Sequence, residues 1–419
     1  MSSEITKPVM LDETGHLIVE GLARQNILLS QLVSASSEAT PVATLNEIHE
    51  IVRAGEAENV FSIGDQIHVN YNNGTTDYVL PFDIVHFDDV VLQDAETVPG
   101  MFLQSHYAMQ PVAFDGNEAF YIDYDGSTFA DLPAGTYHFT MGNSWGSNVV
   151  SGKVYQFTTT ETGKIFQFGT ASSTIGGLPD QNPANWRVLV YADQNATTPL
   201  ERVALTEGSG GTDLGTLSSS TKYSTTGMNN MQRASYGYNR YSHSAMMQFL
   251  NSSAAAGNWW TPKNPFDRPP DQLVSLRGFM AGFDEAFLNI LKPVRVRTAL
   301  NTTSDSEIGT YEDVYNTFFP ASLEQEYIVP QLSGVEGDYW EYWKRRLGLS
   351  SPQAQGAAGT NAAHIRYAYD AKTSAQYFRL RSANRGYASY AWHVYSTGYA
   401  YASYAATSAF RCAPACVIC

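Results

Sequence analysis

The sequence predicts an α+β protein with three parts: an N-terminal helical or extended adaptor, a β-rich middle layer and a larger C-terminal domain. Two observations support this class. Apolar residues recur with helical spacing near residue 45, but from about residue 61 they alternate with polar residues. The composition is 13% aromatic and only 16% charged, which is typical of a β-rich globular chain rather than a disordered one. We expect the parts to comprise residues 1–57, 58–180 and 181–419, with the boundary between the second and third left open.

Residues 1–57 are expected to form an adaptor for oligomerisation or for attachment to a particle. Thr44 and Glu47 have the spacing of a capping box, apolar residues follow at positions 45, 48, 51 and 52, and Gly55 can end the turn. This pattern predicts one short amphipathic helix. Because such a helix cannot bury its apolar stripe alone, it packs on a partner chain, on its own copies or on the following domain.

The middle layer is predicted to consist of short strands. Residues 67–71 and 77–80 flank the turn signal Asn72-Asn73-Gly74, which predicts a β-hairpin. Further strands are expected at 82–87, 101–107, 119–124, 135–141, 154–159 and 164–168, and two more are expected beyond residue 180, at 186–191 and 203–206. The Gly-rich stretch 207–220 is interpreted as an exposed loop, because no Gly-Lys-Ser/Thr sequence of a phosphate loop follows it.

The third part combines short helices with long loops. Helices are expected at 242–250, 284–291, 323–328 and 339–347, and strands at 294–300, 365–369 and 377–381. The last of these strands leads into the stretch on which the functional interpretation depends.

The overall charge excludes several classes of function. The formal net charge is -16 and the sequence pI is about 4.9, so neither nucleic acid nor an anionic membrane is an expected partner. No run of eighteen apolar residues predicts a membrane span, and the first residues lack the pattern of a secretory signal. We therefore expect synthesis in the cytoplasm, and a virus particle is one carrier that could take the protein outside a cell.

Residues 383–404 have the composition of a selected binding surface. They are almost entirely Tyr, Ser, Ala, Gly and Asn, with six tyrosines, and no Asp or Glu follows Asp370. Tyrosine gives a large amphipathic contact at a low rotamer cost, and small polar residues add adaptable hydrogen bonds. Tyr-rich alternation also builds ordinary edge strands, so composition alone leaves a structural strand pair open.

Catalytic and metal-binding patterns are weak. Cys412, Cys416 and Cys419 lack a fourth ligand nearby and are interpreted as apolar residues around a buried final strand, so we expect no metal and no cofactor. No known catalytic motif is present. A pair of carboxylates for a carbohydrate-active enzyme stays possible in principle, and the candidates are Asp284-Glu285, Glu312-Asp313 and Glu324 with Glu326.

The frame around the Tyr-rich stretch resembles a known family. The run Phe378-Arg379-Leu380-Arg381-Ser382 is followed by Ala391-Trp392-x-Val394, by Gly398 and by Arg411-x-x-Pro414-Ala415. This arrangement resembles the variable segment of diversity-generating retroelement proteins of the phage type, similar to the phage tropism determinant. Upstream, Tyr238-Asn239-Arg240, Asn264-Pro265-Phe266-Asp267-Arg268 and the run 319–324 resemble the body that precedes such a segment.

The resemblance implies a fold and a function. It implies a C-type lectin fold of the formylglycine-generating-enzyme type, without oxidase chemistry. It also implies that a reverse transcriptase renews the DNA of the variable segment by randomising adenines. It also implies that scaffold residues hold the segment while variable residues contact the ligand. The scaffold residues are Leu380, Arg381, Ser382, Trp392, Val394, Gly398, Arg411 and Pro414, and the variable ones are Asn384, Tyr387, Ser389, Tyr390, His393, Tyr395, Tyr399, Tyr401, Ser403 and Tyr404.

These expectations converge on a non-enzymatic binding protein of a phage particle. Its partners would be a host surface receptor or a glycan, other virion proteins through the N-terminal segment, and further copies of itself, with a trimer as the working assumption. Alternate residues from His393 to Ser403 could share one strand face, unless residues 396–398 form a turn. Two alternatives stay open: a structural virion protein whose tyrosines form a subunit contact, and a carbohydrate-active enzyme.

Overall fold

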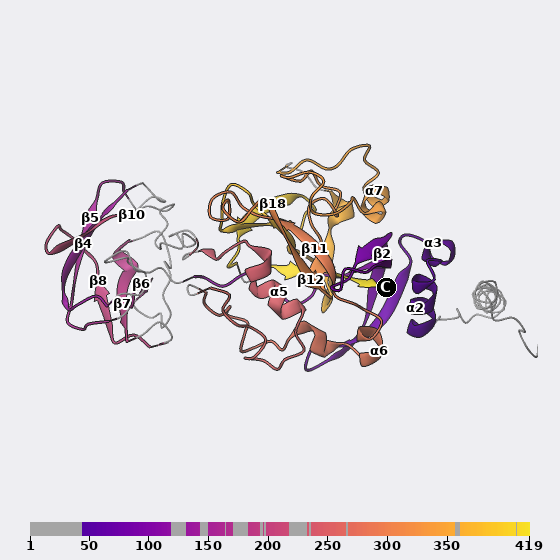
Figure 1. The fold of residues 1–419 in the computed structure, drawn as a ribbon, viewed down its shortest axis with the longest axis horizontal. Helices are drawn as coiled ribbons and strands as arrows, with labels where there is room; N and C mark the ends of the chain where they lie inside the picture. Colours follow the sequence, from indigo (N-terminus) through magenta and orange to yellow (C-terminus); the bar gives the residue numbers. More distant parts are fainter. Residues whose placement is uncertain are drawn as a thin grey trace, which may run out of the picture.

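The computed structural model describes residues 44–118, 131–142, 150–163, 165–170, 183–192, 196, 198–217, 233, 236–264, 267–356, 361–407 and 409–419. Strands predominate and the helices are short, so the prediction of a β-rich α+β protein is confirmed (Figure 1). Residues 1–43, which make up most of the expected adaptor, lie outside the described residues.

The main sheet joins strands from the two ends of the described chain. Its order is β1 (Gln66–Asn72), β2 (Asp77–Val91), β3 (Thr97–Ser105), β20 (Pro414–Ile418) and β13 (Phe319–Pro320), and all neighbours are antiparallel. All five residues of β20 are buried, as the sequence predicted for a final strand. Cys416 pairs with Leu103, and burial raises the pKa of its thiol well above the ordinary range.

The first hairpin of this sheet follows its turn chemistry. The Asn73 side chain accepts the backbone N–H groups of Thr75 and Thr76, and Gly74 adopts a φ of 105°, which a residue without Cβ reaches without strain. β1 and β2 therefore pair as the hairpin predicted from the Asn-Asn-Gly signal.

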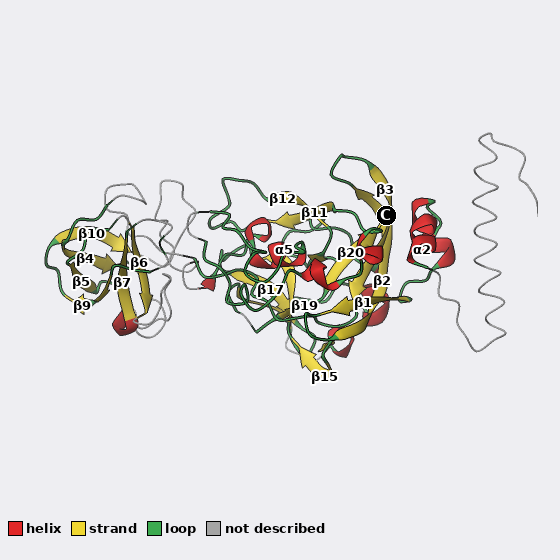
Figure 2. Ribbon diagram, turned by 90° about the horizontal axis from the view of Figure 1, so that it is seen from below, coloured by secondary structure: helices red, strands yellow, loops and turns green. Residues whose placement is uncertain are grey.

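Helix α2 (Leu45–Arg53) covers the main sheet. The predicted capping box is present, since the side chain of Thr44 accepts the N–H of Glu47 and that of Glu47 accepts the N–H of Thr44. Its apolar stripe is buried in the same cluster as β1–β3, and its His49 ring hydrogen-bonds the carbonyl of Cys419 at 3.0 Å. Of the three packing partners considered for this helix, the structure therefore selects the following domain (Figure 2).

The other elements of this body surround one hydrophobic cluster. Phe279, Phe283, Phe287 and Phe318 form its aromatic centre, with ring centroids between 5.0 and 6.4 Å apart. The surrounding elements are α3 (Ala57–Val60), η2 (Tyr241–His243), α5 (Ala245–Leu250), η3 (Phe279–Gly282), α6 (Glu285–Leu288), β11 (Val294–Ala299), β12 (Tyr311–Asn316), α7 (Glu341–Leu347), η4 (Ala362–His364), β14 (Arg366–Ala368) and β15 (Ala371–Gln376).

A β-sandwich is inserted into this body. One sheet has the order β10 (Thr212–Leu217), β4 (Gly135–Met141), β5 (Val154–Thr159) and β9 (Thr206–Glu207), and the other β6 (Ile165–Thr170), β7 (Trp186–Tyr191) and β8 (Glu201–Ala204), with η1 (Pro183–Asn185) before β7. The sheets share a hydrophobic cluster separate from that of the body. At its base, Glu118 and Arg233 form a fully buried ion pair, and the N–H of Glu118 donates to the carbonyl of Arg233 at 3.3 Å.

The buried clusters therefore group the chain differently from the expected ranges. β1–β3 contribute to the core of the body, whereas β4–β10 form the sandwich to the left of it in Figure 1. The expected boundary at residues 180/181 falls between β6 and β7, which pair along their whole length. Local periodicity identifies strands but carries no information on their partners, which explains the difference.

Candidate ligand-binding surface

The Tyr-rich stretch forms the edge of a four-stranded sheet in the body. The order is β18 (Ala400–Tyr404), β17 (Tyr390–Val394), β16 (Phe378–Ala383) and β19 (Arg411–Cys412). Every residue of β16 is buried, whereas β18 is the edge strand and is only partly covered. The stretch is thus supported from one side by a buried strand of the frame.

A tight turn joins β17 to β18. The N–H of Gly398 donates to the carbonyl of Tyr395 at 2.8 Å, and the N–H of Tyr395 donates to that of Tyr399 at 2.9 Å. Gly398 has a φ of 87°, and a Cβ there would lie 1.8 Å from the carbonyl oxygen of Asn361. Both the conformation and the space require glycine at this frame position.

Strand alternation divides the tyrosines between the two faces of the hairpin. Tyr390 pairs with Tyr404 and Trp392 with Ala402, so these residues share one face, while His393 pairs with Tyr401 on the other. Residues 396–398 form the turn that the sequence left open, but the register keeps its phase across this turn. His393 lies opposite Tyr401, and Tyr395 lies opposite Tyr399, so the alternate residues on either side of the turn share one face as expected.

Two aromatic patches result. Patch A consists of Tyr236, Tyr387, Tyr390 and Tyr404, in which Tyr387 stacks on Tyr390 at 5.1 Å and Tyr390 meets Tyr404 edge-on at 5.0 Å between ring centroids. Patch B consists of Tyr377, Tyr395, Tyr399 and Tyr401, in which Tyr395 stacks on Tyr399 at 4.3 Å and lies 5.9 Å from Tyr401. Stacking among these rings limits their freedom before any ligand arrives.

Eight of the ten expected contact residues are at least partly accessible. Tyr387 and Tyr401 are each 50% exposed. The half-buried ones are Asn384, Tyr390, Tyr395, Tyr399, Ser403 and Tyr404.

Ser389 and His393 are fully buried, so the expectation that they lie on the surface is wrong. His393 lies among the rings of Tyr377, Tyr395 and Phe410, with centroids 6.0, 4.9 and 4.6 Å away. Burial and the nearby Arg379 lower the pKa of His393 to about 2, so its ring is neutral.

The frame residues, which lie within the stretch or on either side of it in sequence, are almost all buried. Leu380, Arg381, Ser382, Trp392, Val394, Gly398 and Pro414 are buried, and Arg411 is half-buried. Arg411 pairs with Asp370 at 3.1 Å, and the N–H of the Trp392 indole contacts the side-chain oxygen of Gln331 at 3.4 Å. These side chains are placed to support the stretch rather than to contact a ligand.

Arg379 holds the main chain of both strands of the hairpin. Its buried guanidinium donates to the carbonyls of Ala391 and Ser403, at 3.1 and 3.3 Å, and to that of Tyr404. Burial lowers the pKa of Arg379, and the three carbonyl oxygens offset part of the desolvation cost. None of these contacts depends on the side chains of the stretch.

Asn239 holds the main chain of the loop before β17. Its amide N–H₂ group donates to the carbonyls of Asn384, Tyr387 and Tyr390, at 3.0, 2.7 and 2.7 Å. Its side-chain oxygen accepts the amide of Asn301 at 3.0 Å, and its backbone N–H donates to the carbonyl of Ala388 at 2.8 Å. Asn239 stands in the Tyr-Asn-Arg run noted in the sequence, but nothing in that run indicated which segment it holds.

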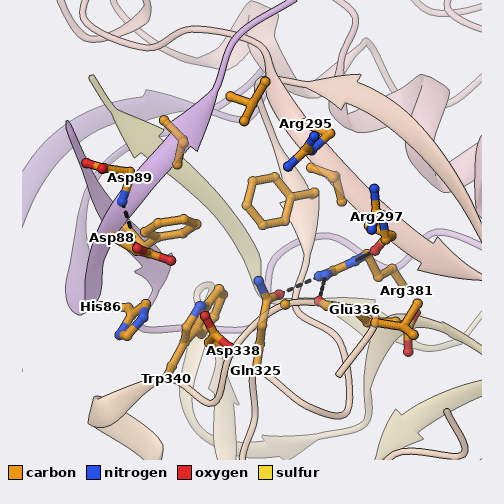
Figure 3. Close-up of a pocket in the computed structure, with 17 residues that line it drawn as sticks. His86, Asp88, Asp89, Arg295, Arg297, Gln325, Glu336, Asp338, Trp340 and Arg381 are labelled. Atoms are coloured by element: carbon orange, nitrogen blue, oxygen red, sulfur yellow. Dashed lines mark hydrogen bonds between the residues drawn. The ribbon is translucent and has the colours of Figure 1, made fainter. Parts of the chain in front are cut away.

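A pocket of about 190 Å³ lies elsewhere on the body (Figure 3). Asp88, Asp338, Arg295 and Trp340 are among its lining residues, and no residue of 383–404 is. The frame reaches the pocket through Arg381, which donates to the carbonyl of Glu336 and to the side-chain oxygen of Gln325, as the dashed lines in Figure 3 show. The pocket is therefore distinct from both patches.

Several of the carboxylates considered as enzyme candidates have structural partners. Glu312 pairs with Arg240 and Asp313 with Arg297, at 2.6 and 2.7 Å. Buried Glu324 accepts backbone N–H groups at residues 334–336, and Glu326 accepts the amide of Gln104 at 2.6 Å. Burial raises the pKa of Glu326 to about 7.

Comparison with known proteins gives one result. Residues 217–419 match a family model described as a domain of unknown function, DUF6273. No curated protein and no solved structure matches the chain. The matched residues include Asn239, the frame and both patches, whereas β1–β3 and strands β4–β9 of the sandwich precede them. In the described part of the chain, no helix has the length and apolarity needed to cross a membrane.

Proposed function

We propose that residues 383–404 form a ligand-binding surface whose exposed side chains are interchangeable. The observation that carries this proposal is the way in which the stretch is held. Side chains from outside it, those of Asn239 and Arg379, donate to six of its carbonyl groups between Asn384 and Tyr404. A backbone held through its carbonyls keeps its course when the side chains change.

The composition of the exposed groups supports binding. Phenol rings stacked in two patches present apolar faces and hydroxyl groups at a low entropic cost, which is typical of paratopes. A few exposed rings, Tyr387 and Tyr401 foremost, would carry most of the affinity.

The frame motif supports the biological setting. Its resemblance to retroelement-diversified proteins leads us to propose a C-type lectin-like body on a phage particle, with a host surface receptor or glycan as ligand. The N-terminal segment would attach the protein to other virion proteins, and homo-oligomerisation, as a trimer in the simplest case, would raise the avidity of weak sites.

Comparison of sibling isolates tests this proposal. We expect sequence differences to be concentrated in residues 383–404, with Asn239, Arg379 and Gly398 unchanged. We also expect a reverse transcriptase gene nearby and a near-copy of the segment's DNA that differs at adenines. Differences spread evenly along the chain would refute the proposal.

The alternatives predict other results. If the tyrosines form a subunit contact, Tyr387 and Tyr401 will be nitrated by tetranitromethane in the isolated chain but protected in assembled particles. A carbohydrate-active enzyme would release sugars from a glycan panel, and substitution of a carboxylate, not of a patch tyrosine, would abolish the release.

A further inference from the structure

Each aromatic patch contains one ring from outside the variable stretch. In patch A this ring is Tyr236, which precedes the frame by more than a hundred residues, and in patch B it is Tyr377, immediately before β16. Both are half-buried. The diversification proposed above would leave both rings in place while their neighbours change.

Tyr236 connects the stretch to the inserted sandwich. Its ring stacks on that of Tyr404 with a centroid distance of 3.7 Å and an interplanar angle of 11°. It also packs against the hydrophobic cluster of the sandwich, and its carbonyl accepts the N–H of Ala406 at 2.8 Å. Tyr236 is therefore held from behind, and position 404 meets a preformed flat surface.

Tyr377 makes comparable contacts in patch B. Its ring stacks on Phe410, also outside the stretch, at 5.0 Å and 6°, and lies 4.7 Å from the ring of Tyr395. Its carbonyl accepts the N–H of Arg411 at 3.0 Å. Position 395 thus meets a ring that is fixed by a second ring and by the frame.

We propose that Tyr236 and Tyr377 are positioning residues of the binding surface, each of which orients whatever aromatic residue the stretch carries at position 404 or 395. This inference rests on the proposed function. A stacked pair favours one ring orientation by about 2- to 10-fold, and a ring oriented in advance loses less entropy on binding. Binders should therefore favour aromatic residues at these two positions.

A protein surface is the ligand class that this arrangement fits. Small-molecule sites are concave and enclose most of the ligand. Neither the pocket at Trp340 nor a second one beside Asn70 and Asp284 is lined by a patch tyrosine. Flat rings with hydroxyl groups at their edges match the apolar and main-chain groups of a protein partner.

A display library of the full chain tests the inference. Positions 387, 390, 395, 399, 401, 403 and 404 are randomised, and lysozyme is the probe protein. Three versions of the frame are compared: unchanged, Tyr236→Leu and Tyr377→Leu. Leucine keeps apolar volume against the sandwich or Phe410 but removes the ring, and an epitope tag normalises for display level.

In the unchanged frame, we expect aromatic residues at 404 and 395 to be enriched at least about 3-fold among binders. Tyr236→Leu should abolish the enrichment at 404 and leave that at 395, and Tyr377→Leu should do the reverse, so each variant is the control for the other. Tyr236→Phe and Tyr377→Phe keep the aromatic ring and should therefore keep the enrichment at 404 and 395. A general folding defect at either position would instead remove the enrichment in the Phe variants too.

Equal enrichment in all frames, or loss at both positions from either substitution, would overturn the inference while leaving the proposed function intact. Failure of every frame to yield lysozyme binders would overturn the proposed function and the inference together.

Discussion

The substitution Asn239→Ala should loosen residues 383–404 more than any change to their exposed side chains. Asn239 is fully buried, and its amide holds the loop between β16 and β17 through three carbonyls. Alanine leaves those carbonyls, and the amide of Asn301, without this partner inside the protein. The surrounding frame and patches keep their own contacts.

The magnitude follows from the hydrogen bonds. Two N–H groups and one carbonyl oxygen of the Asn239 side chain are lost, at about 1 kcal/mol each, so the stretch should open more easily by about 3 kcal/mol. This corresponds to a roughly 100-fold increase in the population of the open state. Replacing Tyr387 and Tyr401, each half exposed, with serine should cost about 0.5 kcal/mol per site.

Hydrogen–deuterium exchange measures this opening directly. The amides of Asn384 and Tyr390, which donate to carbonyls within the loop at 2.9 and 3.3 Å, report on it. We expect their protection to fall about 100-fold in Asn239→Ala and less than 10-fold in the Tyr387→Ser/Tyr401→Ser double variant. Asn70→Ala, which removes an exposed amide contact to Asp284, is the matched control and should leave both amides unchanged.

Equal or greater loss of protection in the double tyrosine variant would refute the reasoning. The exposed rings, rather than the carbonyl contacts, would then stabilise the stretch, and its side chains could not be exchanged freely.

Three further predictions concern the frame and the inserted sandwich. Gly398→Ala should destabilise the body by several kcal/mol or abolish soluble expression, whereas Gly386→Ala, whose nearest neighbour would lie 3.6 Å from the new Cβ, should change the melting temperature by less than about 2 °C. Burial lowers the pKa of His393 to about 2, whereas the ring in the unfolded chain titrates near 6.5. The unfolded state therefore takes up a proton as the pH falls from 6.5 to 5, and the free energy of unfolding should fall by about 2 kcal/mol over this range. Urea titrations at the two pH values should show this fall, and a smaller one for His393→Asn. Replacing residues 119–232 with a short Gly-Ser linker should leave one cooperative calorimetric transition of the body, because Glu118 and Arg233 are already in contact. Loss of that transition would show that the core of the body depends on the sandwich.

Local signals in the sequence predicted many individual elements. The strands at 135–141, 154–159 and 186–191 coincide with β4, β5 and β7, and the capping box of α2 is present. These features depend on neighbouring residues, which a single sequence displays directly.

Elements set by distant contacts could not be predicted. Residues 323–328, expected as a helix, instead form turns, with Glu324 bound to the backbone of residues 334–336. The Gly-rich stretch expected as a loop contains β10, which exists because it pairs in parallel with β4. In both cases a tertiary partner overrides the local preference.

In the candidate site, too, some features follow from local sequence signals and others from distant contacts. Composition singled out residues 383–404, and the frame motif placed the supporting residues beside them in sequence. The separation into two patches follows from strand alternation. The burial of His393 and the contribution of Tyr236 instead arise from contacts between the stretch and rings outside it. No periodicity could indicate these contacts.

The position of β20 has a consequence for biosynthesis. This strand follows residues 383–404 along the chain, yet it lies between β3 and β13 in the main sheet of the body. The ribosome must therefore translate the stretch in frame to its end before that sheet can close. If residues 383–404 are diversified as proposed, a frameshift or premature stop introduced with new side chains would leave β3 without its neighbour, and the unfolded product would be a substrate for cellular proteases. Folding itself would then proofread each new copy for integrity, while remaining indifferent to which ligand it recognises.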